Sequence, residues 1–258
     1  MGVLEMDLEE LKPKERFSDR VQNYAKYRPE YPNEIISYLH SAVGLNKNSV
    51  IADIGSGTGI CTKVFLDNGN IVYAVEPNQD MRQSAEYLLG AYDNFYSIDG
   101  SAENTKLQSE SIDIITVAQA FHWFTPKPTK EEFFRILKPN GVVVLLWNYR
   151  KKNSYGFMHD YLELIRKYSA SYTNESSDDI MSHFFGDRTI HTKVFPNPQK
   201  SDFKRLKGEL ASFSYMPKEG DANFQSMISD LQALFNQYSS NESVVLEYET
   251  YLYYCKFK

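Results

Sequence analysis

The stretch VIADIGSGTGICTKVF at residues 50–65 places three glycines between two apolar runs. Gly55, Gly57 and Gly59 alternate with small polar residues, and Asp53 precedes them. Glycine permits unusual backbone dihedrals and lets a ligand approach the main chain closely. In an open parallel sheet, the turn that follows a strand lies at the edge where ligands bind. The turn therefore predicts a binding site for a nucleotide phosphate, a nicotinamide dinucleotide or another ligand.

The spacing around the turn narrows these ligand classes. A dinucleotide fingerprint has its third glycine one position later, where Ile60 stands, and a phosphate-binding P-loop ends in Gly-Lys-Ser/Thr, which is absent here. Glu76 ends the next apolar run, VYAVEP, 17 positions after Gly59. A carboxylate at that position accepts hydrogen bonds from both ribose hydroxyls of an adenosine, whether or not the ligand is a dinucleotide.

A second group of candidates lies at the ends of two later apolar runs. His122 follows the run 111–121 and is the candidate general base, which would take a proton from a hydroxyl or a carbon acid. A carboxylate acceptor needs no base, and His122 would then only hydrogen-bond to it or pack between its aromatic neighbours. Four more residues are candidates for an acceptor pocket, with helix–sheet packing as the alternative for the tryptophans: Trp123, Trp147, Asn148 and Arg150.

These residues need a scaffold, and residues 33–148 alternate strand and helix patterns. Continuous apolar strands between helices are typical of a parallel sheet that is covered on both faces. The expected strands are 49–55, 70–77, 94–100, 111–121 and 141–148. The expected helices are 33–43, 59–69, 78–90 and 129–141, the last with Thr129 and Glu132 as a capping box.

The pattern changes after Trp147, and no linker separates a second domain. We expect helices at 157–168 and 222–238, a helix and turn at 201–217, and strands at 191–199 and 243–257. The last strand follows a helix and should be antiparallel. The sequence thus predicts one domain over 1–258, with an N-terminal lid segment at 1–32 and an insert that forms the pocket at 151–217.

The composition excludes several function classes. The 258-residue chain has a net charge of −6 and no basic run, which disfavours nucleic-acid partners. Its two cysteines lack partners at metal-ligand spacing, so no metal site is expected. The N-terminus lacks the apolar core of a secretory leader, and no apolar run is long enough for a membrane span. We therefore expect a cytoplasmic protein, monomer or homodimer, with a small-molecule substrate.

Several stretches resemble the successive motifs of class I S-adenosylmethionine-dependent methyltransferases, in particular the type 11 small-molecule group. They are ADIGSGTG, VEPNQDMR, GSAENTKLQSESIDIITVAQAFHWF and RILKPNGVVVLLWN. The stretches YRPEYP, AQAFHWF and YETYLYY are similar to a trans-aconitate-methyltransferase-like subgroup. The likeness covers nearly the whole chain. It implies a Rossmann-like α/β fold with a doubly wound, mostly parallel seven-stranded sheet, an antiparallel last strand and helical lid insertions.

The resemblance also implies the residues that bind S-adenosyl-L-methionine. The backbone of Gly55, Ser56 and Gly57 would pass under its methionine part. Asp53 would hold the turn or reach the amino group through water, and Glu76 would hold the ribose.

The adenine and the methyl group would have their own neighbours. Residues expected around the adenine are Pro77, Met81, Ser101, Ala102 and Glu103. Many relatives have an aspartate where Ser101 stands, so Asp99, Ser101 or a backbone carbonyl would contact the adenine amino group. Those expected beside the methionine and the methyl group are Gln119 and Ala120, and those expected to close over the cofactor are Tyr24, Tyr27 and Arg28.

The function expected from the sequence is methyl transfer to a small organic molecule, a carboxylic acid or a hydroxyl compound, with S-adenosyl-L-homocysteine as product. Two alternatives are a non-catalytic adenosylmethionine-binding regulatory module and a nicotinamide-dependent oxidoreductase. The displaced third glycine argues against the oxidoreductase.

Overall fold

A seven-stranded sheet is the central layer of the computed structural model, which describes residues 27–151, 155–169, 181, 184–213 and 215–258. Its strand order is β3-β2-β1-β4-β5-β9-β6. The strands are β1 Val50–Ile54, β2 Ile71–Val75, β3 Phe95–Ile98, β4 Ile112–Ala118, β5 Leu137–Arg150, β6 His191–Pro196 and β9 Tyr248–Lys256. The order reverses between β1 and β4, the switch point at which open α/β sheets bind ligands.

The direction of the strands confirms the expected fold class. Strands β1 to β5 pair in parallel, and β9 is antiparallel to both β5 and β6. Helices flank the sheet: α3 Glu34–Val43, α4 Ile60–Asp67, α5 Gln79–Leu89 and α6 Pro126–Ile136. The chain thus has a Rossmann-like, mostly parallel sheet with one antiparallel strand.

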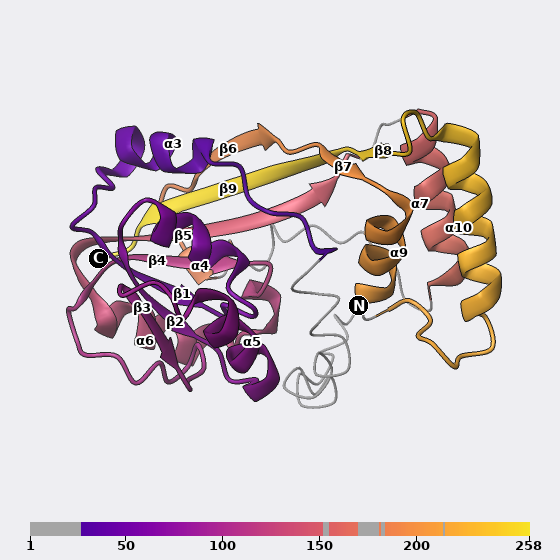
Figure 1. Ribbon diagram of the computed structural model, residues 1–258. Helices are drawn as coiled ribbons and strands as arrows, with labels where there is room; N and C mark the ends of the chain where they lie inside the picture. Colours follow the sequence, from indigo (N-terminus) through magenta and orange to yellow (C-terminus); the bar gives the residue numbers. More distant parts are fainter. Residues whose placement is uncertain (1–26, 152–154, 170–180, 182–183, 214) are drawn as a thin grey trace, which may run out of the picture.

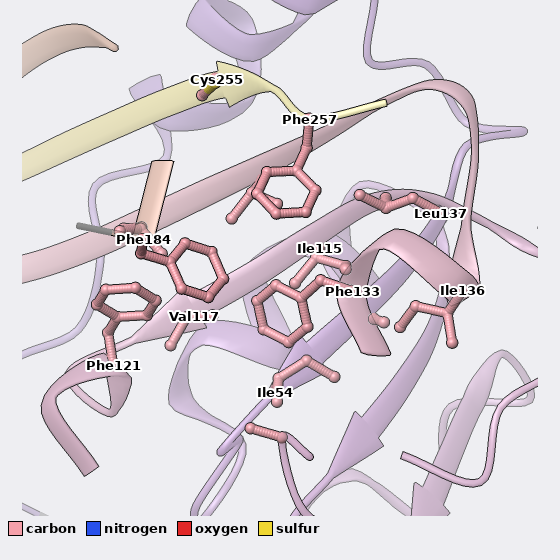
Figure 2. Packing of buried hydrophobic residues seen from close by; sticks show 14 of the residues in the cluster. Ile54, Ile115, Val117, Phe121, Phe133, Ile136, Leu137, Phe184, Cys255 and Phe257 are labelled. Atoms are coloured by element: carbon pink, nitrogen blue, oxygen red, sulfur yellow. The ribbon is translucent and has the colours of Figure 1, made fainter. Parts of the chain in front are cut away.

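Successive side chains of the strands pack into two separate hydrophobic clusters, one on each face of the sheet. On β1, Ile51 packs in a cluster with α3 and α4, whereas Ala52 and Ile54 pack in a cluster with α6. Figure 2 shows the second cluster, where Phe133 of α6 lies against Ile115 and Phe184. Because the pleat sends successive residues to opposite faces, strands that are apolar throughout require helices on both faces.

A helical lobe with its own core stands at one end of the long strands β5 and β9 (Figure 1). It contains α7 Phe157–Tyr168, α9 Phe203–Ser212 and α10 Phe224–Tyr238, which bury one cluster that includes Tyr161, Leu206 and Leu231. Strands β7 Gln199–Ser201 and β8 Val244–Leu246 form a small second sheet beside it. The lobe extends beyond the expected insert at 151–217, because α10 packs into the same core.

Two local predictions need correction. Helix α6 starts at Pro126 and not at Thr129, since proline is favoured in the first helical turn. Thr129 is buried inside the helix, and Glu132 accepts hydrogen bonds from Thr105, so they form no capping box. The expected strand 243–257 is divided into β8 and β9, which belong to different sheets.

Candidate functional site

A cavity of about 160 Å³ lies at the carboxyl ends of β1, β2 and β4. Its wall includes most of the residues that the sequence analysis singled out, from four separate segments of the chain. These are Gly55, Gly57, Glu76, Pro77, Met81, Ser101, Ala102, Glu103, Gln119, Ala120 and Trp123. The fold therefore brings the glycine turn, the acid after β2 and the end of β4 to one hollow.

Gly55 and Gly57 of the turn both have a positive φ, and each leaves space for a different neighbour. Gly55 has a φ of 69°, and a Cβ atom there would lie 2.6 Å from that of Ala120. This glycine lets the turn pack against the end of β4. Gly57 has a φ of 58°, and a Cβ atom there would meet nothing within 4 Å. Its main chain therefore faces open space in the cavity wall, as close approach of a ligand requires.

Glu76 is fixed by backbone donors on both of its oxygens. Oε2 accepts from the N–H of Gly57 at 2.9 Å, and Oε1 accepts from the N–H of Asn78 at 2.8 Å. Burial is the main effect on the pKa of Glu76 and raises it, while these hydrogen bonds lower it. Each oxygen retains a further lone pair for a ligand hydroxyl.

Asp53 lies under the turn and outside the cavity wall. It is fully buried and accepts from Thr62 Oγ1 at 2.6 Å and from Thr116 Oγ1 at 2.9 Å. Burial raises the pKa of Asp53 to about 6, against these hydrogen bonds. The carboxyl thus ties α4 and β4 to β1. The neighbouring Ser56 is buried, and its N–H donates to the carbonyl of Val75 at 3.2 Å.

Gln119 has strained backbone geometry at the end of β4. Its φ is 58°, which is rare for a residue with a Cβ atom. Its Nε2 donates to the carbonyl of Asn148 at 3.1 Å, which joins the cavity wall to β5. Such strain is concentrated at functional sites.

His122 and Trp123 belong to a short 3₁₀ helix, Phe121–Trp123, and their rings lie 4.8 Å apart. Trp123 lines the cavity, whereas His122 does not. Protein atoms around His122 lower its pKa to about 4, although water still reaches part of this exposed residue.

The other acceptor candidates divide between the core and the lobe. Trp147 is 4% exposed and packs edge-to-face against Phe121, so its surroundings are those of a core residue. Asn148 is buried and donates to the carbonyls of Pro29 and Glu30. Arg150 lies at the junction with the lobe.

The expected cofactor lid is only partly described. Arg28 donates to the carbonyl of Ser212 at 3.3 Å and stacks 4.4 Å over Phe213, so it contacts the lobe and not the cavity wall. Tyr27 lies against Gly208 of α9. Tyr24 and most of the expected segment 1–32 lie outside the described residues.

Sequence reasoning missed two residues of the cavity wall, Ala118 and Phe124. The signal for Phe124 was its place directly after the AQAFHW stretch.

No group of three potential metal ligands occurs in the described part of the chain. Within the same residues, no helix is both long and apolar enough to cross a membrane.

The comparisons with known proteins agree with this geometry. Residues 52–145 match the model of a methyltransferase domain family. An uncharacterized methyltransferase of Schizosaccharomyces pombe is 26% identical over 221 residues, which are 83% of this chain and 86% of that protein. An uncharacterized methyltransferase of Mycobacterium tuberculosis is 34% identical over 149 residues, 58% of each protein.

Solved structures share the fold at low identity. A putative type II methyltransferase from Anaeromyxobacter dehalogenans superposes with a TM-score of 0.65 at 17% identity, over 89% of this chain and 97% of that one. A Haemonchus contortus N-methyltransferase, solved with S-adenosylhomocysteine, has a TM-score of 0.55 at 14% identity, over 99% of this chain and 60% of that one. The domain match, the relatives and the fold together support an S-adenosylmethionine-dependent methyltransferase.

Proposed function

We propose that this S-adenosylmethionine-dependent methyltransferase methylates a small organic molecule, a carboxylic acid or a hydroxyl compound, and that its cofactor binds in the cavity at the glycine turn. The carboxylate of Glu76 carries this proposal. It lies in the cavity wall and is fixed by backbone N–H groups from the turn and from the start of α5. An adenosine ribose presents two hydroxyl donors to such a carboxylate.

The residues of the wall fit the cofactor. The open space at Gly57 accommodates the methionine part against bare backbone. Glu76 accepts the ribose hydroxyls, and Pro77 and Met81 provide apolar contact for the adenine. When bound, the cofactor supplies an electrophilic methyl group on a sulfonium sulfur.

The protein then has to hold the acceptor in line and exclude water. Trp123 and Phe124 make the wall aromatic, and aromatic faces attract cations that have lost their water. His122 stands next to Trp123 but outside the cavity wall, and nearby protein atoms lower its pKa, which favours the neutral ring. A neutral imidazole has one ring nitrogen that accepts a proton and one that donates a hydrogen bond, so both roles expected from the sequence stay open to it.

The proposal is tested by incubating the protein and S-adenosylmethionine with a panel of small carboxylic acids and hydroxyl compounds. Release of S-adenosylhomocysteine is measured in each reaction. We expect turnover with at least one member, and turnover about 5–150-fold lower with Glu76→Ala at the same subsaturating cofactor concentration. Cofactor binding without turnover on any member would contradict the acceptor class. Equal turnover by the variant would contradict the cofactor site.

A further inference from the structure

An arginine with unused hydrogen-bond donors lies between the sheet and the helical lobe. Arg150 is the last residue of β5, which reaches toward α7 and α9 in Figure 1. Its Nη1 donates to the Tyr215 hydroxyl at 3.4 Å. Its Nε and Nη2 are buried and have no hydrogen-bond partner among the described residues. An unpaired buried donor is costly, and more so when it is charged.

The two unpaired nitrogens belong to one edge of the guanidinium. That edge carries two parallel N–H groups, whose spacing matches the two oxygens of a carboxylate. The face of the group is also in use, because Arg150 stacks 4.2 Å over the ring of Phe213. Stacking and the bond to Tyr215 therefore hold the guanidinium in place, while its other edge makes no hydrogen bond within the described chain.

Two more unpaired polar atoms lie in the same cluster. The hydroxyl of Tyr161, whose ring centre is 5.9 Å from the guanidinium, has no partner in the described chain. Glu209 Oε1 accepts from the Tyr248 hydroxyl at 2.6 Å, whereas its buried Oε2 likewise lacks a partner there. The unpaired atoms thus come from three elements, β5, α7 and α9.

The charges of the cluster favour an anion. Arg28, Arg150 and Arg205 all act electrostatically on the buried carboxyl of Glu209. Burial raises the pKa of Glu209, against the effect of these arginines. The arginines that act on Glu209 thus outnumber this one carboxyl.

The cluster adjoins the proposed methyl-transfer site. Gln119 lines the cavity and donates to the carbonyl of Asn148, which precedes Arg150 by two positions on β5. Two residues of a strand span about 7 Å. Asn148 also donates to the main chain of Pro29 and Glu30, which form the segment beside Arg28.

We infer that the methyl acceptor carries a carboxylate bound by Nε and Nη2 of Arg150, with Tyr161 and Glu209 available to a second polar group of the same molecule. This inference rests on the proposed function. A carboxylate fits better than a phosphate, because a single guanidinium edge offers two parallel N–H donors, which match the two oxygens of one carboxylate.

The first test needs no acceptor. Arg150→Met removes the buried unpaired donors and keeps an unbranched apolar side chain. We expect its melting temperature in sodium chloride to equal or exceed that of the wild type. Arg166→Met is the matched control, because Arg166 is an exposed residue of α7 that pairs only with Glu163 in the described structure. A melting temperature clearly below those of the wild type and the control would show a structural role and overturn the inference.

The second test uses sodium formate, acetate, succinate and benzoate against chloride at matched ionic strength. We expect at least one carboxylate, at about ten times its dissociation constant, to raise the melting temperature of the wild type by about 2–4 °C. Arg166→Met should keep this shift and Arg150→Met should lose it. The inference is wrong if no carboxylate stabilises the wild type, if the shift survives in Arg150→Met, or if inorganic phosphate gives the larger shift.

Titration with S-adenosylhomocysteine separates this inference from the proposed function. We expect the wild type and Arg150→Met to bind it equally. A wild type that fails to bind it would contradict the proposed function, while the carboxylate shift would still be measurable. Loss of S-adenosylhomocysteine binding in Arg150→Met alone would show that Arg150 binds the cofactor, and would overturn its assignment to the acceptor.

Discussion

Replacement of Glu76 by alanine should weaken cofactor binding more than it destabilises the fold. In the structure, the two oxygens of Glu76 accept one backbone N–H each, from Gly57 and Asn78. Both oxygens have capacity for one more hydrogen bond, which the ribose hydroxyls would supply. Alanine removes these acceptors and leaves the backbone donors of the turn without their partner.

The magnitude follows from the burial of the site. Hydrogen bonds to a charged group contribute about 1.5–3 kcal/mol each. Glu76 is 9% exposed, so water enters the space left by its side chain and recovers part of this energy. We therefore expect S-adenosylhomocysteine affinity to fall by about 1–3 kcal/mol, or about 5–150-fold. Loss of a buried carboxylate with a raised pKa offsets part of the effect on stability.

Calorimetric titration of S-adenosylhomocysteine into Glu76→Ala and the wild type measures this effect. Asp67→Asn is the control, because Asp67 is an acid at the far end of α4, where it pairs with Lys63 on the surface. The control should bind like the wild type. Equal affinity of Glu76→Ala and the wild type would refute the assignment of Glu76 to the ribose.

Three further predictions concern the turn, the lobe and the pH dependence of stability. Gly57→Ala places a side chain at a φ of 58°, which costs about 1–2 kcal/mol of folding free energy. Its methyl group enters the cavity, so calorimetry should show weaker S-adenosylhomocysteine binding. Unchanged binding would mean that Gly57 does not contact the cofactor. Gly208→Ala puts a Cβ atom 2.2 Å from the ring of Tyr27, which should lower the free energy of unfolding, measured by chemical denaturation, by about 1–3 kcal/mol. An unchanged denaturation midpoint would mean that the Tyr27 ring can leave α9 without loss of stability. For Asp53, the pKa of about 6 exceeds the ordinary 3.8, so the native state binds more protons than the unfolded state between these pH values, and stability falls as pH rises through this window. Asp53→Asn removes that dependence, so the free energy of unfolding of the variant relative to the wild type should rise by about 3 kcal/mol between pH 3.5 and 7. If this difference in free energy stays constant with pH, burial does not raise the pKa of Asp53.

Local sequence patterns predicted several residues that line the cavity. The turn at Gly57 and the acid at Glu76 follow strands directly, and parallel strands bring their carboxyl ends to one edge. The proximity of these residues therefore follows from the order of elements alone. Phe124 was missed because it follows a 3₁₀ helix whose direction no periodicity indicates.

Residues beyond β5 were harder to place, because their positions depend on contacts distant in sequence. Trp147 and Asn148 are adjacent on one strand, so they point to opposite faces, and the sequence does not say which face is the core. The lobe buries α7 against α10, which are separated by more than fifty residues. Arg150 was singled out as an acceptor contact, but its unpaired edge became visible only in the structure.

The central claim is that the glycine turn and Glu76 bind S-adenosylmethionine. Titration calorimetry of the wild type with S-adenosylmethionine, S-adenosylhomocysteine and NAD, side by side, tests it most directly. We predict saturable binding of the first two at one site and no binding of NAD. Binding of NAD alone, or of none of the three, would contradict the claim and leave only the fold established.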